Sequence, residues 1–165
     1  MAVYTNLNEA QLKKFLKLYE IGKLISFSGI REGIENSNFH IKTSNGNFIL
    51  TIFEKRVRNE DIPFFIKIMK HLNNKGYCCP KPISDKKNNY IQELLGKPTI
   101  IVNFLEGKSK IISTIEDCYQ VGSSMGIMHS KSSDFKLKRE NSLSFKGWEK
   151  LINKCYDTVP TTVLN

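Results

Sequence analysis

An apolar run that ends abruptly at an acidic residue and a glycine constrains the fold of this chain more than any other feature. Residues 100–105 read Ile-Ile-Val-Asn-Phe-Leu, and Glu106-Gly107 follow. A short apolar run bounded by turn residues is typical of a buried strand. The residues before it suffice for a small domain with its own core, whereas only residues 108–165 come after it. We therefore predict one domain over residues 1–105 and the start of a second, incomplete domain over residues 106–165.

Helical spacing of apolar residues predicts two helices in the first domain. One follows Asn8, which can cap it, and stops at Gly22; the other spans residues 59–76, with Pro63 in its first turn. Runs of β-branched and aromatic residues predict five strands, over residues 24–28, 38–43, 48–53, 90–94 and 98–104. The Asn-Gly pair at residues 45–46 predicts a tight hairpin with positive φ angles. This order predicts an α+β fold in which a five-stranded antiparallel sheet has a helix inserted after its third strand.

The part beyond residue 106 is predicted to be helical. A helix over residues 114–130 begins with Thr114 as its cap and with acidic residues in its first turn. A shorter helix is predicted over residues 148–156, and residues 158–165 show no apolar periodicity. The four cysteines have neither C-x-x-C spacing nor nearby histidine pairs, so we expect reduced thiols and no metal site.

Charge and composition restrict the class of function. The net charge is +9, but only four of the 25 basic residues are arginines, and the lysines are scattered. Bidentate recognition of nucleic acids favours arginine, so we expect a solvated basic surface and no nucleic-acid partner. No apolar run approaches the ~20 residues of a membrane span, which argues against a membrane partner. The N-terminal residues lack the pattern of a secretory signal, and we expect a cytoplasmic protein.

The loop between the first two predicted strands is one candidate binding site. It contains Gly29 and Gly33, which would let backbone amides approach a phosphate closely. The side chains of Asn36, Ser37 and Asn38 could add hydrogen bonds. The loop has no Gly-Lys-Ser/Thr ending of the Walker type, and a plain hairpin loop that uses glycines for its turn geometry is the alternative.

The third and fifth predicted strands carry a second candidate site. Thr51 interrupts an apolar run; it either fills the strand or turns its hydroxyl toward a ligand, with Lys55 or Arg56 supplying positive charge. At residues 102–105, an exposed backbone carbonyl and amide could pair with the edge of a base without any particular side chain. An apolar edge strand is the alternative interpretation of residues 102–105.

These segments together resemble a known family. The matching segments are residues 1–5 (Met-Ala-Val-Tyr-Thr), 33–39 (Gly-Ile-Glu-Asn-Ser-Asn-Phe), 48–57 (Phe-Ile-Leu-Thr-Ile-Phe-Glu-Lys-Arg-Val), 63–65 (Pro-Phe-Phe), 79–82 (Cys-Pro-Lys-Pro), 102–107 (Val-Asn-Phe-Leu-Glu-Gly), 128–129 (Met-His) and 138–142 (Lys-Arg-Glu-Asn-Ser). In this combination the sequence resembles the homoserine kinases of the choline kinase and aminoglycoside phosphotransferase superfamily. The resemblance extends nearly to Trp148 and concerns the first half of that family.

The resemblance implies a protein-kinase-like small lobe that binds nucleotide over residues 1–105. Residues 106–165 would be a hinge and the first helices of an incomplete, helical large lobe. The implied reaction is ATP-dependent phosphorylation of the hydroxyl of L-homoserine, a step toward threonine, with magnesium as the metal. The implied ATP-binding residues are Gly33, Glu35, Asn36, Ser37, Asn38, Thr51, Val102, Asn103, Phe104 and Leu105.

The catalytic segments of that family do not occur in these residues. They are a loop of the type His-Gly/Ala-Asp-Leu-x-x-x-Asn and a later metal-binding Asp-Phe pair, and Asp134-Phe135 lacks the preceding loop. We therefore expect no catalytic residue and no magnesium ligand here, and a shortened chain that is inactive alone. One alternative is a non-catalytic module that binds nucleotide or a partner, such as a complementing C-terminal half. Another is a different small-molecule kinase of the superfamily, of the choline or aminoglycoside type.

Overall fold

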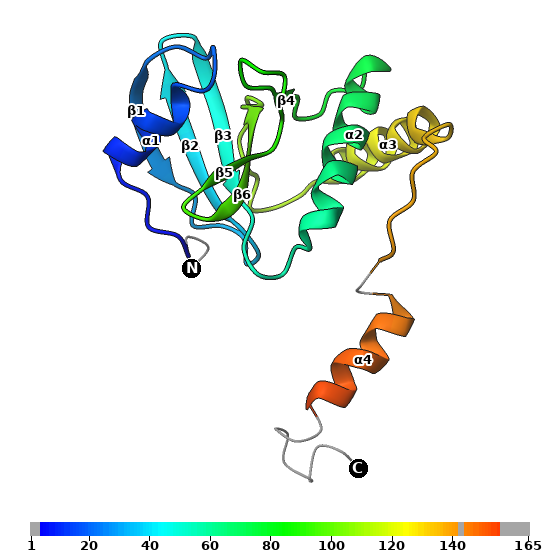
Figure 1. Ribbon diagram of the computed structural model, residues 1–165. Coiled ribbons are helices and arrows are strands. Elements are labelled where there is room, and N and C mark those ends of the chain that lie inside the picture. The colour runs from blue at the N-terminus through cyan, green and yellow to red at the C-terminus, as the bar shows by residue number, and fades with distance from the viewer. Residues whose placement is uncertain (1–3, 142–143, 156–165) are drawn as a thin grey trace.

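The computed structural model describes residues 4–141 and 144–155, whose arrangement Figure 1 shows. In these residues one antiparallel sheet contains the strands β1 (Leu24–Gly29), β2 (Ser37–Thr43), β3 (Gly46–Ile52), β4 (Pro82–Ile83), β5 (Gln92–Leu94) and β6 (Lys97–Asn103). The α-helices are α1 (Glu9–Leu16), α2 (Ile62–Asn74), α3 (Ile115–Ser132) and α4 (Phe145–Cys155). The predicted α+β class is confirmed. The tail at residues 158–165 lies outside the described residues.

The sheet has the strand order β1-β2-β3-β6-β4, and β5 also pairs with β6. β6 is central, because β3 lies on one side of it and both β4 and β5 lie on the other. The predicted five strands are therefore corrected to six. The missed strand, β4, consists of Pro82 and Ile83 alone. Two residues are too few to show a period, and Pro80 and Pro82 are typical of a connecting segment rather than of a strand.

Two tight turns set the register of the sheet. Between β2 and β3, Gly46 has a φ of 136°, whereas Asn45 does not have the positive φ that the Asn-Gly pair predicted. Between β5 and β6 the turn consists of Leu95 (φ 55°) and Gly96 (φ 74°). Two consecutive residues with positive φ match the twist of a two-residue hairpin loop.

Helix α1 begins as the sequence predicts and ends earlier. The Asn8 side chain accepts a hydrogen bond from the Gln11 amide, and the Gln11 side chain accepts one from the Asn8 amide, which completes a capping box. The helix ends at Leu16 rather than at Gly22. Gly22 lies in the following turn with a φ of 86°, where an added Cβ would collide with the Ser44 side chain. The turn, and not a helix end, therefore requires glycine at position 22.

Alternate residues of the central strands face two separate apolar cores. On one face Leu50 of β3 and Ile101 of β6 pack with Leu12 of α1, and all three are completely buried. On the other face Val102 of β6 packs with Ile66 of α2. This follows from the two-residue period of a strand. Helices α1 and α2 therefore cover opposite faces of the sheet.

The helices after the sheet are much more exposed. The predicted helix at residues 114–130 is confirmed as α3, with a capping box between Thr114 and Asp117, and none of its residues is buried. The helix predicted at residues 148–156 begins earlier, at Phe145, and Tyr156 lies outside the described residues. In Figure 1, α4 projects away from the sheet and from α2. No helix in the described part of the chain is long and apolar enough to span a membrane.

Candidate functional site

A cavity of about 590 Å³ lies between the sheet and α2. It is lined by Ile30, Glu35, Asn36, Asn38, Ile49, Thr51, Phe53, Val57, Phe65, Met69, Pro80, Ile100, Val102, Asn103, Phe104 and Leu105. The lining comes from the loop before β2, from β3 and β6, from α2 and from the segment that follows β6. Both candidate sites of the sequence therefore meet at one cavity.

The inner surface of the cavity is largely apolar. Ile49 of β3 and Phe53, directly after β3, flank Thr51, and Ile100 of β6 lies opposite Thr51 in the paired strand. Across the cavity, Met69 of α2 forms part of the opposite wall. Two apolar walls with a few polar groups at the edges are typical of a small-molecule site.

The segment after β6 forms one rim of the cavity, and its backbone amides differ in whether they are free to bind a ligand. The amide of Asn103 donates to the Lys81 carbonyl at 3.1 Å, and the amide of Phe104 donates to the Asn47 carbonyl at 3.0 Å. In the described residues the Leu105 amide has no such partner. Of the predicted rim residues 102–105, Leu105 therefore offers a free backbone donor to a ligand.

The loop before β2 forms the opposite rim. Glu35, Asn36 and Asn38 line the cavity as the sequence predicts. Asn38 accepts a hydrogen bond from the Thr51 hydroxyl at 2.8 Å, so the two predicted polar residues form a pair across β2 and β3. Gly33 does not line the cavity; it lies in the loop beside it, with a φ of 104° that favours glycine.

Ser37 is the predicted contact whose side chain points elsewhere. It is completely buried, and its hydroxyl donates to Glu54 at 2.7 Å and accepts from the amides of Tyr4 and Thr5. The contact of Ser37 with a ligand stays a prediction, while its hydroxyl is directed into the protein. The reason is geometric, because Ser37 begins β2 and must face away from its neighbour Asn38.

Glu54 lies at the centre of a polar cluster behind that loop. Its carboxylate accepts hydrogen bonds from Thr5 at 2.6 Å, from Ser37, and from Lys97 at 2.5 Å, while its backbone amide lies 3.4 Å from the Asn36 side-chain oxygen. Burial alone would raise the pKa of Glu54, but these hydrogen bonds and the charge of Lys97 together lower it. Glu54 is therefore an ionised anchor for these side chains.

Positive charge is adjacent to the cavity and absent from its lining. Among the lining residues, only Glu35 is charged. Lys55 and Arg56, which the sequence suggested as a source of charge, line a neighbouring cavity of about 420 Å³. The two cavities share Glu35, so the cations lie next to the rim formed by the loop.

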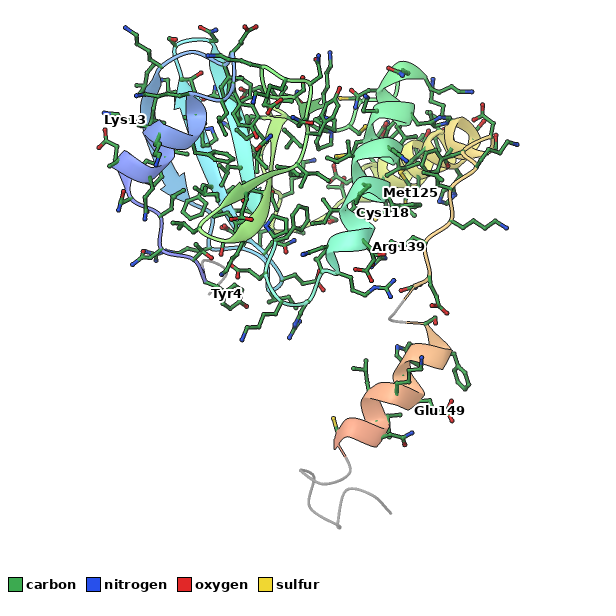
Figure 2. The ribbon with its side chains drawn as sticks, viewed as in Figure 1. Tyr4, Lys13, Cys118, Met125, Arg139 and Glu149 are labelled. Carbon is green, nitrogen blue, oxygen red and sulfur yellow. The ribbon has the colours of Figure 1, made fainter. Side chains whose placement is uncertain are left out.

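Residues after α3 are held against α2. Asp134 forms an ion pair with Lys75 at 2.6 Å and lies 3.1 Å from the His71 Nε2, and the Phe135 ring packs against Phe64, so the Asp134-Phe135 pair is engaged in packing. The Nε of Arg139 lies 3.0 Å from Asp61 as an ion pair without good hydrogen-bond geometry. The Arg139 guanidinium also lies 5.1 Å from the centre of the Phe65 ring, which lines the cavity. Figure 2 shows Arg139 on the segment that returns from α3 toward α2.

Sequence reasoning missed the apolar part of the site. The missed residues are Ile30, Ile49, Phe53, Val57, Phe65, Met69, Pro80 and Ile100. For the strand residues a signal existed, since Ile49 and Phe53 are two positions from Thr51 and must share its face. For Phe65 and Met69 the helical period predicted only that they lie on the apolar face of a helix. It could not show that part of this face borders a cavity.

Comparisons with known proteins agree with this architecture. Residues 26–150 match the model of the phosphotransferase enzyme family. A homoserine kinase of Methylobacterium radiotolerans is 46% identical over 151 residues, which cover 92% of this chain and 47% of that protein. A homoserine kinase of Mesorhizobium japonicum is 46% identical over 157 residues, 95% of this chain and 49% of that protein. The chain thus spans about half the length of the curated relatives it matches.

Solved structures extend the similarity to the fold. The crystal structure of spectinomycin phosphotransferase in complex with ADP and spectinomycin has a TM-score of 0.66 and 16% identity, and the match covers 94% of this chain and 48% of that chain. The AMP-bound complex of that enzyme has a TM-score of 0.61 and 15% identity. The predicted kinase-like small lobe is thereby confirmed as the fold. Because the family model also matches most of the sequence, the chain belongs to the phosphotransferase enzyme family.

Proposed function

We propose that this chain is the ATP-binding part of a homoserine kinase, which transfers a phosphoryl group from ATP to the hydroxyl of L-homoserine on the route to threonine. The observation that carries the proposal is the cavity between the sheet and α2, with apolar walls and a free amide at its rim. The choice of acceptor rests on the 46% identity to homoserine kinases. We further propose that the protein works in the cytoplasm.

The residues of the cavity fit the parts of an adenine nucleotide. Apolar side chains on β3, β6 and α2 would enclose the base, and the Leu105 amide would donate a hydrogen bond to its edge. The loop around Gly33 would lie along the phosphates, with Asn36 and the Thr51–Asn38 pair as polar contacts. Lys55 and Arg56, which line the neighbouring cavity, are candidate cations for the phosphate charge. Phosphoryl transfer depends on such positioning and charge stabilisation.

Magnesium fits the described residues poorly. No three side chains of His, Cys, Asp or Glu gather into a metal-binding group in residues 4–141 and 144–155. The 165 residues also contain no loop of the His-Gly/Ala-Asp-Leu-x-x-x-Asn type. We propose that the metal ligands and the catalytic base belong to residues outside this sequence, and that the chain alone binds nucleotide without turning over homoserine.

A turnover assay tests this proposal. ADP formation would be measured with ATP, magnesium and L-homoserine for the chain alone, and for a fusion in which it replaces the matching half of the Mesorhizobium japonicum relative. We expect no turnover by the chain alone and homoserine-dependent turnover by the fusion. Choline and an aminoglycoside serve as competing acceptors. Turnover by the chain alone would contradict the proposed inactivity, and a fusion that prefers another hydroxyl acceptor would contradict the substrate.

A second candidate is a non-catalytic module that another polypeptide completes. It is favoured by the exposed apolar residues around α3, including Ile112 and Ile115, which are 82% and 92% exposed. Such surfaces in a soluble domain mark sites that a partner covers. Mixing the chain with the separate second half of the relative distinguishes the two candidates, because only a complementing pair would regain turnover without a covalent link.

A further inference from the structure

Tyr4 and Thr5 lie ahead of the first helix and contact the loop that borders the cavity. We infer that they position this loop for the phosphates of a bound nucleotide and thereby determine phosphate affinity without touching the ligand. The inference rests on the proposed nucleotide site and assigns a role to a segment outside the lining of the 590 Å³ cavity; Tyr4 itself lines the neighbouring cavity with Lys55 and Arg56. Figure 2 shows Tyr4 at the end of the sheet where the N-terminal segment begins.

The loop has few contacts of its own. Residues 31–35 are all exposed, and none of them belongs to a helix or strand. The loop is closed at its base by a hydrogen bond from the Ile30 amide to the Asn38 carbonyl at 2.8 Å. Exposed backbone with few buried contacts has low local stability, so added contacts have a large influence on its position.

The N-terminal segment supplies such contacts. The Tyr4 hydroxyl donates to the Ile34 carbonyl at 2.9 Å, at the tip of the loop. The amides of Tyr4 and Thr5 donate to the Ser37 hydroxyl at 2.9 and 3.0 Å, at the end of the loop. Each bond joins residues about thirty positions apart in the sequence, so the segment holds the loop from outside.

The segment is itself fixed to the sheet. The Thr5 hydroxyl donates to Glu54 at 2.6 Å and accepts from Lys97 at 2.7 Å, which ties it to the residues at the end of β3 and at the start of β6. Thr5 is buried, while Tyr4 is 57% exposed. Thr5 is therefore the anchor, and the Tyr4 ring extends from it over the surface to reach the loop. Removing the Tyr4 hydroxyl should release the loop without disturbing the core.

The decisive readout compares ligands with and without phosphates. Adenosine would use only the base site at the Leu105 rim, whereas ADP would also need the loop. A neutral hydrogen bond contributes on the order of 1 kcal/mol, which corresponds to about a fivefold change in affinity. We expect Tyr4→Phe to weaken ADP binding about fivefold and to leave adenosine binding unchanged. A loss of general stability would weaken both ligands alike.

The experiment uses the full 165-residue chain with Tyr4→Phe, Thr5→Val and the hydroxyl-retaining Thr5→Ser. ADP and adenosine affinities are measured by calorimetry, and amide hydrogen exchange is followed at residues 31–37. We expect faster exchange and selective loss of ADP affinity in Tyr4→Phe and Thr5→Val, with recovery in Thr5→Ser. Unchanged exchange in Tyr4→Phe, or equal weakening of both ligands, would overturn the inference. If the unmodified chain binds neither ligand, the proposed function fails, and exchange alone then decides whether the segment positions the loop.

Discussion

The Glu54 carboxylate accepts hydrogen bonds from side chains of three separate parts of the chain: the N-terminal segment, the start of β2 and the start of β6. Its side chain is only 10% exposed, while that of Lys97 is 37% exposed. Solvent therefore screens the ion pair, and the hydrogen bonds contribute more than the charge attraction. Removing the carboxylate charge should leave buried donors poorly satisfied.

We expect Glu54→Gln to lower the free energy of unfolding by about 1–3 kcal/mol at pH 7, measured by urea denaturation. The pKa of Glu54 is lowered in the folded protein, so its contribution is complete above the ordinary value of 4.5 and is lost as the pH falls through the lowered pKa. The stabilities of the two proteins should converge there. Glu93→Gln, on an exposed residue of β5, is the control, with an expected change within about 0.5 kcal/mol. A stability difference that does not change with pH would contradict the assignment.

Several site residues could be predicted from sequence because glycine and polar residues interrupt apolar runs there. Asn36, Asn38 and Thr51 stand out in the sequence in this way, and all three line the cavity. The inward direction of the Ser37 side chain could also have been predicted from sequence, since alternation along a strand places it on the face opposite Asn38. The partners of Ser37 could not be predicted, because Tyr4 and Glu54 reach it from distant positions and no local pattern encodes such contacts.

Helices α1 and α3 were predictable at their starts because both carry a capping box within four residues of sequence. Their ends were less predictable, as the early end of α1 at Leu16 shows. β4 could not be predicted, because it is defined only by its pairing with β6 and no local periodicity indicates that pairing. Local chemistry thus identified the starts of the two capped helices, α1 and α3, whereas α4 begins three residues before its predicted start.

The exposed apolar side chains of α3 lead to a prediction about association. Ile115 is 92% exposed, so replacing it with a charged residue removes no buried contact. We expect Ile115→Lys to leave the melting temperature within about 2 °C and to reduce concentration-dependent self-association in analytical ultracentrifugation. As a contrast, Ile66→Lys at the 5% exposed position on α2 should unfold the domain. Marked destabilisation by Ile115→Lys would mean that α3 is packed more tightly than its exposure indicates.

The chain consists of a well-packed sheet domain and a helical part with little core of its own. The boundary at residues 105–106 stays a prediction; residues 105–111 beside it are all exposed. Side-chain contacts such as the Tyr77–Ser124 hydrogen bond at 2.9 Å and the Arg139–Asp61 ion pair hold the helical part to the residues that flank α2. The Phe135 ring also lies against Phe64 of α2, with 5.7 Å between the ring centres. The sequence could not predict this docking, because it depends on isolated polar and aromatic pairs rather than on a periodic apolar face.

The central claim is that the cavity between the sheet and α2 binds ATP, and calorimetric titration of ATP with magnesium into the folded chain tests it most directly. Leu105→Pro removes the free amide donor at the rim, and Leu105→Ala keeps that donor and serves as the matched control. We predict saturable one-to-one binding by the unmodified chain and by Leu105→Ala, and about fivefold weaker binding by Leu105→Pro. A chain that is folded by circular dichroism and shows no saturable ATP binding would contradict the claim.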